Sequence, residues 1–208
     1  MLSVSGSVTL PANAKFWIGA AALAGGTLLL VSSANATVLD AGYDGVYAAQ
    51  CPRIPVEYLR ALAAKESDTN PREAKGLLQV VESVRLDYNK KFGTSYTRQD
   101  LLIPAVNVKI SCDLFGTIVN GLGGVDWSDI QQVDVFTFAW NAGWSESRGV
   151  TGVVAYLKQQ GQPVTIDTVS AAAATLPWAS KFLTDSAKVA WCKSVGSLYL
   201  HELRQNSA

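Results

Sequence analysis

The sequence predicts an all-α domain that follows a hydrophobic N-terminal segment. Apolar residues recur at spacings of three and four along most of the chain after residue 55, as amphipathic helices require. Strand-like alternation of apolar and polar residues is nearly absent. With 208 residues, of which 49% are hydrophobic and 16% charged, the chain can bury one full core but not two. We therefore expect one globular domain over residues 37–208 and a separate segment over residues 1–36.

The N-terminal segment contains an uncharged apolar run over residues 16–31, with Lys15 before it and Ala34 and Ala36 after it. At about 1.5 Å per residue a helix of this length spans roughly 24 Å, less than the ~30 Å of a bilayer core. Its length and the small residues at 34 and 36 predict a secretory signal peptide cut after Ala36. A retained membrane anchor is an equal alternative, and a short core helix is a third. Signal and anchor both export the chain from Thr37 onward.

Residues 37–54 are expected to be a lead-in, because Pro52 and two glycines interrupt any long helix. The first helix is predicted from Pro55, which suits a first turn, to Glu66. Helical spacing of apolar residues then predicts a second helix over 77–88, with Gln79 in its first turn. A polar loop over 90–97 follows.

The remainder of the chain is predicted to contain five more helices, several with clear end signals. Asp129 is a good N-cap for one of them, and Gly143 ends it. Asp167 is expected to cap an alanine-rich helix. The five expected ranges are 105–119, 129–143, 149–160, 167–174 and 180–203.

Charge and cysteine content argue against nucleic-acid binding and against a metal or cofactor site. Seventeen basic residues balance seventeen acidic ones without a basic cluster, so a nucleic-acid partner is not expected. Cys51, Cys112, Cys192 and His201 lie far apart in the sequence, without the close ligand pairs typical of zinc sites, so no metal or cofactor is expected. In an exported protein two of the three cysteines are expected to form a disulfide, and the sequence does not choose the pair.

Glu66 is the strongest candidate for a catalytic residue. It continues the apolar stripe of Leu59, Leu62 and Ala63 on the predicted first helix, so its carboxyl group is expected to face the core. Burial raises the pKa of a carboxylic acid toward neutrality, which suits a general acid. The alternative is a structural role in which Glu66 only ends the helix, ahead of turn-forming residues.

Four motifs occur in order between residues 55 and 150. They are Glu66-Ser67 with Asn70-Pro71, Gly76-Leu77-Leu78-Gln79-Val80, Leu102-Ile103-Pro104-Ala105-Val106-Asn107-Val108 and Phe138-Ala139-Trp140-Asn141-Ala142-Gly143. Each motif alone is weak, but together they resemble the lysozyme-like lytic transglycosylases, which cleave bacterial peptidoglycan. The resemblance implies a lysozyme-like helical fold.

The resemblance also implies a site and a reaction. Glu66 would be the single catalytic acid and base for the β-1,4 bond between N-acetylmuramic acid and N-acetylglucosamine, with a 1,6-anhydro sugar as product. Ser67, Gln79, Trp140 and Asn141 would bind the glycan. The alternatives are a hydrolytic muramidase of the same fold and an inactive, membrane-tethered component that binds peptidoglycan. A phage, a secretion apparatus and wall turnover all remain open as the biological setting, with the domain facing the cell wall or carried by a virion.

The sequence departs from the family pattern in two places. Only Arg72–Lys75 separate Pro71 from Gly76, which implies a shorter wall on that side of the cleft. Trp140 stands where the family has tyrosine, and the family's late tyrosine falls near Trp191. This comparison implies that Glu66 lacks one hydrogen-bond partner found in the family. The other tryptophans Trp127, Trp144 and Trp178 are expected in the core or at the rim of the cleft.

Overall fold

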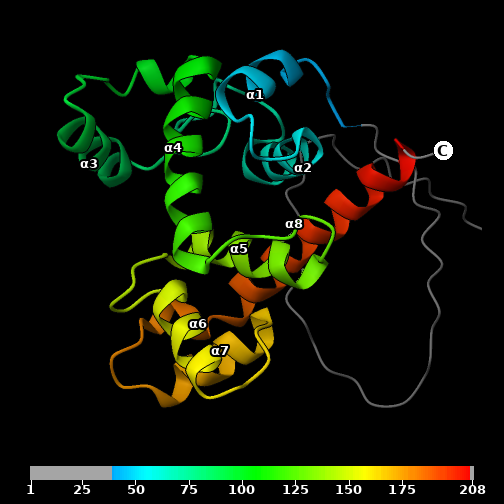
Figure 1. Ribbon diagram of the computed structural model, residues 1–208. Helices are drawn as coiled ribbons and strands as arrows, with labels where there is room; N and C mark the ends of the chain where they lie inside the picture. Colours follow the sequence, from blue (N-terminus) through cyan, green and yellow to red (C-terminus); the bar gives the residue numbers. More distant parts are fainter. Residues whose placement is uncertain (1–38, 207–208) are drawn as a thin grey trace, which may run out of the picture. The chain divides into compact units, whose positions relative to one another are not determined.

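The computed structural model describes residues 39–206 (Figure 1), and no β-strand occurs among them. The expectation of an all-α domain is therefore confirmed for this part of the chain. The predicted signal peptide or anchor over residues 1–36 lies outside the described residues. The described elements are α1 (Asp44–Gln50), α2 (Val56–Ser67), α3 (Glu82–Phe92), the 3₁₀ helix η1 (Asp100–Leu102), α4 (Pro104–Leu122), α5 (Ile130–Ala142), α6 (Val150–Gln159), α7 (Ile166–Thr175), the 3₁₀ helix η2 (Lys181–Thr184) and α8 (Ser186–Gln205).

The core is built around α2, α5 and α8, the long C-terminal helix that packs along the other two. Tyr58 of α2 lies at its centre and is fully buried. Its ring contacts those of Trp127, Phe136 and Tyr199, and its hydroxyl lies 3.0 Å from the hydroxyl of Thr137 on α5. These contacts fix the position of α2 relative to α5, the two helices that carry most of the candidate site.

A smaller apolar cluster lies beside α4, where α3 stands at one side of the domain (Figure 1). Tyr88 of α3 and Ile110 of α4 are both buried in it. The hydroxyl of Tyr88 donates a hydrogen bond to Asp113 of α4 at 2.6 Å. This cluster holds α3 against α4.

The predicted second helix begins five residues later than expected. Residues 77–79 form turns, and α3 covers Glu82–Phe92 instead of 77–88. Leu77, Leu78 and Val80 are all buried. Gln79 has a φ of 51°, which an α-helix does not allow. The apolar spacing that predicted a helix here comes from a tight, buried turn.

Three other boundaries also differ from those expected. Thr165, rather than Asp167, caps α7, because its hydroxyl accepts a hydrogen bond from the backbone amide of Thr168 in a capping box. Asp185 accepts the amides at the start of α8 and so divides the expected helix over 180–203 into η2 and α8. The lead-in contains the short helix α1, which buries Tyr47.

The capping signals of α5 are confirmed. The side chain of Asp129 accepts a hydrogen bond from the amide of Gln131 at 2.9 Å, and Gly143 follows the last helical residue with a φ of 105°.

The structure also identifies the two cysteines that form the disulfide. Cys51, at the end of α1, forms a disulfide with Cys112 of α4, while Cys192 is free and buried.

Two further observations concern the described residues 39–206 only. No group of three or more histidine, cysteine, aspartate or glutamate side chains is arranged there to hold a metal ion. No helix within this range has both the length and the apolar character needed to cross a bilayer.

Candidate active site

Glu66 lies in the last turn of α2, and its carboxylate contacts α5. The indole N–H of Trp140 donates a hydrogen bond to Oε1 of Glu66 at 3.1 Å. Burial raises the pKa of Glu66 from 4.5 to about 7, against the opposing effects of the Trp140 hydrogen bond and of the positive charges on Lys75 and Lys188. The site thus holds a carboxyl group that is partly protonated near neutral pH, as its place on the apolar stripe predicted.

The chain turns sharply directly after Glu66. Asp68 and Thr69 both have positive φ angles, of 54° and 57°, and these end α2. The buried hydroxyl of Ser67 donates to the carbonyl oxygens of Ala63, at 3.2 Å, and Leu77, at 2.8 Å. Ser67 therefore fastens the following loop to the end of α2, and its side chain is not among those that line the pocket beside Glu66.

The loop that contains Gly76 is held in a conformation that only glycine allows. Gly76 has a φ of 74°, and a Cβ atom there would lie 1.9 Å from the carbonyl oxygen of Leu101 and 2.3 Å from Nδ2 of Asn107. Three residues later, the side-chain amide of Gln79 donates to the carbonyl of Gly76 at 2.8 Å. These contacts hold the Gln79 side chain at the pocket.

Asn107 of α4 organises the same loop, a role that the sequence did not reveal. Its Oδ1 accepts the amide of Leu78 at 2.7 Å, and its Nδ2 donates to the carbonyls of Lys75 and Leu101 at 2.8 and 3.1 Å. Asn107 is fully buried, so these hydrogen bonds are sheltered from water. Its place in the third motif, within an apolar helix, was the signal that could have revealed this role.

Two lysines complete the site, and no sequence motif marked either of them. Lys188 of α8 donates to Oδ1 of Asn141 at 2.9 Å, which orients the asparagine at the end of α5. Lys75 comes from the short loop before Gly76, and its charge acts on Glu66 across the pocket. Only the packing of α8 against α5 brings Lys188, 122 positions after Glu66 in the sequence, into this place.

These side chains surround a pocket of about 310 Å³. Four of the five predicted site residues line it together, and Ser67 is the exception. Glu66 is the only carboxylate among the lining residues, all of which belong to the described part of the chain. The lining consists of Glu66, Lys75, Gln79, Val81, Val84, Trp140, Asn141, Trp144 and Lys188.

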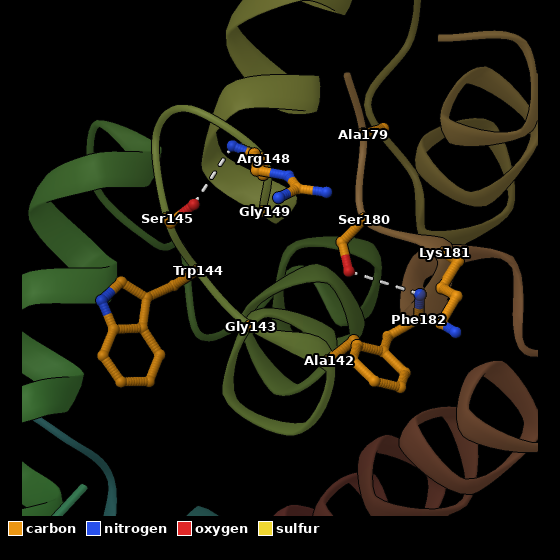
Figure 2. A pocket seen from close by; sticks show the side chains of 10 residues that line it. All are labelled: Ala142, Gly143, Trp144, Ser145, Arg148, Gly149, Ala179, Ser180, Lys181 and Phe182. Carbon is orange, nitrogen blue, oxygen red and sulfur yellow. Dashed lines mark hydrogen bonds between the residues drawn. The ribbon is translucent and has the colours of Figure 1, made fainter. Parts of the chain in front are cut away.

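A second, larger pocket of about 680 Å³ shares a lining residue with the first. Figure 2 shows the residues that line this second pocket. Trp144 lines both pockets, and Ala142 of the second pocket directly follows Asn141 of the first. Trp144 thus lies at the rim, as expected. Trp127 packs in the core against Tyr58, whereas Trp178 is exposed.

Comparison with known proteins decides the family. The family model of the transglycosylase SLT domain matches residues 46–156, which is more than half of the chain. The chain belongs to the transglycosylase SLT domain family. The match covers Glu66, Gln79, Trp140 and Asn141, whereas Lys188 lies beyond it. The lytic transglycosylase family indicated by the four motifs is therefore confirmed.

A solved structure shows the same fold as this SLT domain. The crystal structure of the 70 kDa soluble lytic transglycosylase Slt70 from Escherichia coli matches with a TM-score of 0.55 and 19% sequence identity, over 77% of this chain. The match covers 24% of Slt70, so the present chain corresponds to about a quarter of that enzyme's length. No curated protein matches the chain.

Proposed function

We propose that the protein is a peptidoglycan lytic transglycosylase, in which Glu66 is the only catalytic acid and base. The observation that carries this proposal is the position of Glu66: partly buried, next to a pocket, with a pKa raised to about 7. A group with this pKa is available both protonated and ionised near neutral pH. Both forms are needed when one residue first donates a proton and later removes one.

In the proposed reaction, protonated Glu66 donates its proton to the oxygen that links N-acetylmuramic acid to N-acetylglucosamine. The bond breaks, and the positive charge that develops on the sugar ring is stabilised without a protein nucleophile. The Glu66 carboxylate then accepts the proton of the 6-hydroxyl group of the muramoyl sugar, whose oxygen closes a 1,6-anhydro ring. The Trp140 N–H and the charges of Lys75 and Lys188 stabilise the carboxylate between these two steps.

The lining of the pocket supports a reaction with one carboxylate. Glycosidases with two carboxylates place them about 5 to 9 Å apart on either side of the bond. No second carboxylate lines this pocket in the described residues. A hydrolytic muramidase that uses one acid and an activated water remains the alternative enzyme, and an inactive component that binds peptidoglycan is the other.

Substrate binding is assigned to the polar and aromatic groups around Glu66. Gln79 and Asn141 present amide groups that suit the acetamido and hydroxyl groups of the glycan, while Trp140 and Trp144 present aromatic surface to sugar rings. Ser67 receives a positioning role instead, because both of its hydrogen bonds join backbone carbonyls. No cofactor takes part in the proposed reaction.

We further propose that the domain acts outside the cytoplasm, where peptidoglycan lies, and opens the wall locally for a phage or a secretion apparatus. Lys15, the apolar run over 16–31 and the small residues up to Ala36 support export by a signal peptide or an anchor. The disulfide between Cys51 and Cys112 agrees with an oxidising compartment. N-terminal sequencing of the exported protein distinguishes a mature chain that begins at Thr37 from a retained anchor, and a domain found only in the cytoplasm would contradict both.

The product of digestion tests the enzymatic proposal. Purified peptidoglycan incubated with the protein should release muropeptides with 1,6-anhydromuramoyl ends, which mass spectrometry distinguishes from hydrolysed ends by about 18 Da, the mass of one water. Hydrolysed ends would instead assign the protein to the muramidases. Bound but uncut glycan would show that the site is inactive.

A further inference from the structure

The interface between α5 and α8 contains a carboxyl group that the proposed reaction does not use. Asp134 lies on α5, and its Oδ1 is buried without a hydrogen-bond partner among the described residues. A buried carboxylate oxygen normally accepts at least one hydrogen bond, because water no longer solvates it. The interface therefore suits the neutral, protonated form of Asp134 better than its charged form.

A glycine on α8 makes this burial possible. A Cβ atom at Gly196 would lie 2.2 Å from Oδ1 of Asp134 and 2.9 Å from Cδ1 of Ile130, so a larger residue would push the two helices apart. Glycine is unfavourable inside a helix, and Gly196 lies well inside the 20-residue α8. The close contact between α5 and α8 at Asp134 thus depends on the missing side chain.

Burial raises the pKa of Asp134 from 3.8 to about 6, and the charges that face it do not cancel this effect. The positive charge of Lys193 on α8 lowers the pKa, whereas the negative charge of Asp167 on α7 raises it. These two residues form an ion pair at 2.8 Å, so Lys193 is shared between two carboxylates. The charge of Asp134 also acts on Cys192 of α8 and Tyr58 of α2, and neither supplies a positive charge.

The same interface carries residues of the candidate active site. Lys188, Cys192 and Gly196 follow one another at spacings of four, so they lie on one face of α8. Lys188 donates to Asn141 at 2.9 Å, and Asn141 lies seven positions after Asp134, on the same side of α5. About 12 Å of helix separates Lys188 from Gly196. Because α8 packs along α5 (Figure 1), it joins the contact at Asp134 directly to the contact at Asn141.

We infer that the interface between α5 and α8 is a pH-sensitive contact. With Asp134 protonated, α8 stays closely packed on α5; with Asp134 ionised, α8 separates from α5 more often and withdraws Lys188 from Asn141. The folded pKa of Asp134 lies above its ordinary value of 3.8, so the packed interface is most stable below pH 3.8 and loses this stability as pH rises through about 6. This inference does not depend on the reaction proposed for Glu66.

The thiol of Cys192 reports on opening of this interface, because it is fully buried there and is the one cysteine outside the disulfide. N-ethylmaleimide, at concentrations where the rate is proportional to the reagent, alkylates this thiol in open molecules. The alkylation rate in urea-unfolded protein divided by the rate in native protein then measures the protection of Cys192 at each pH. Every sample is the full chain with Glu66→Gln, because Glu66 also titrates near neutral pH and its charge acts on Cys192.

Between pH 5 and pH 8 this protection should fall about tenfold, the factor expected when a pKa of 3.8 in the open interface becomes about 6 in the packed one. Asp134→Asn has no carboxyl group at this position, so its protection should be constant, and Asp134→Ala should give the same result without adding an amide. The matched control is Asp87→Asn, which removes an exposed carboxylate of α3 and should retain the fall. Circular dichroism at both pH values checks that each variant is folded.

Amide hydrogen exchange, corrected for the intrinsic rate at each pH, separates opening of the interface from unfolding of the whole domain. In the same Glu66→Gln background, peptides of α8 that contain Lys188 should lose protection between pH 5 and pH 8, and peptides of α4 should not. Three outcomes would overturn the inference. These are protection of Cys192 that does not change with pH, an undiminished fall in Asp134→Asn, or equal losses of exchange protection in α8 and α4.

Discussion

The indole N–H of Trp140 and the carboxylate of Glu66 are joined by a hydrogen bond of 3.1 Å between two different helices. The lytic transglycosylase pattern has a tyrosine at the place of Trp140. Its late tyrosine, whose hydroxyl approaches the acid, falls near Trp191, and this second difference implied that Glu66 would lack a hydrogen-bond partner. The indole supplies one. Unlike a tyrosine hydroxyl, the indole N–H only donates, so it favours the ionised form of the acid and limits how far burial raises its pKa.

Replacing Glu66 with glutamine should abolish cleavage of peptidoglycan and leave the fold intact. The amide has the same shape and can still accept the Trp140 hydrogen bond, but it cannot deliver a proton. We expect the rate of glycan cleavage to fall at least ~100-fold, the usual contribution of one general acid. Release of soluble muropeptides from purified peptidoglycan measures this rate, and Glu73→Gln in the exposed loop is the matched control. Cleavage by Glu66→Gln at the wild-type rate would remove Glu66 from the mechanism.

The same variant should be more stable than the wild type at alkaline pH. The folded pKa of Glu66 lies above its unfolded value of 4.5, so the folded state binds more protons between pH 4.5 and about 7. The contribution of Glu66 to stability is therefore present below pH 4.5 and is lost as pH rises through about 7. Urea unfolding measures the unfolding free energy of both proteins at pH 5 and pH 8. The difference between variant and wild type should shift in favour of the variant by on the order of 2 kcal/mol from pH 5 to pH 8. A constant difference would contradict the raised pKa.

Cleavage should decline as pH rises through the pKa of Glu66. The first proton transfer needs the protonated acid, whose fraction falls above a pKa of about 7. The rate should therefore be lower at pH 8 than at pH 6, with circular dichroism confirming the fold at both values. Lys188→Met removes one of the charges that lower this pKa, so it should move the decline to higher pH. A flat profile between pH 4 and 8 would refute the buried-acid interpretation.

Gly76→Ala should impair both stability and activity. The added Cβ atom would collide with the carbonyl of Leu101 and with the Asn107 amide, and the φ of 74° is unfavourable for alanine. We expect a loss of about 2 kcal/mol or more in unfolding free energy, with displacement of Gln79 from the pocket. Gly116→Ala is the matched control, because nothing lies within 4 Å of its added Cβ atom on the exposed face of α4. This control should be neutral or slightly stabilising.

Removing the disulfide should lower the stability of the domain without altering the site. The bond closes a loop across 61 positions between α1 and α4, and neither of its cysteines lines the pocket at Glu66. For Cys51→Ala with Cys112→Ala we expect a loss of about 2–4 kcal/mol in unfolding free energy. A reducing agent should bring the wild type to the same midpoint in chemical unfolding and leave the variant unchanged. If the agent moves both equally, the buried Cys192 is involved instead.

Periodicity and capping predicted most of the helices because these signals are local. The apolar stripe of α2 and the caps of α5 depend on neighbours three or four positions away, so the sequence alone located both helices. The start of α3 could not be predicted in this way. Buried Leu77, Leu78 and Val80 form a turn that depends on Asn107, a residue distant in the sequence.

The sequence by itself determined the fold class and the family and predicted Glu66 as the acid, because each of these inferences follows from residue types at short spacings. Only the tertiary structure decided what surrounds that acid. Packing of α8 against α5 brings in Lys188, the Trp140 indole reaches Glu66 across the gap between α5 and α2, and Ser67 turns toward backbone carbonyls. The pKa of a carboxyl group depends on burial and on nearby charges in three dimensions, and spacing along a chain does not specify these distances.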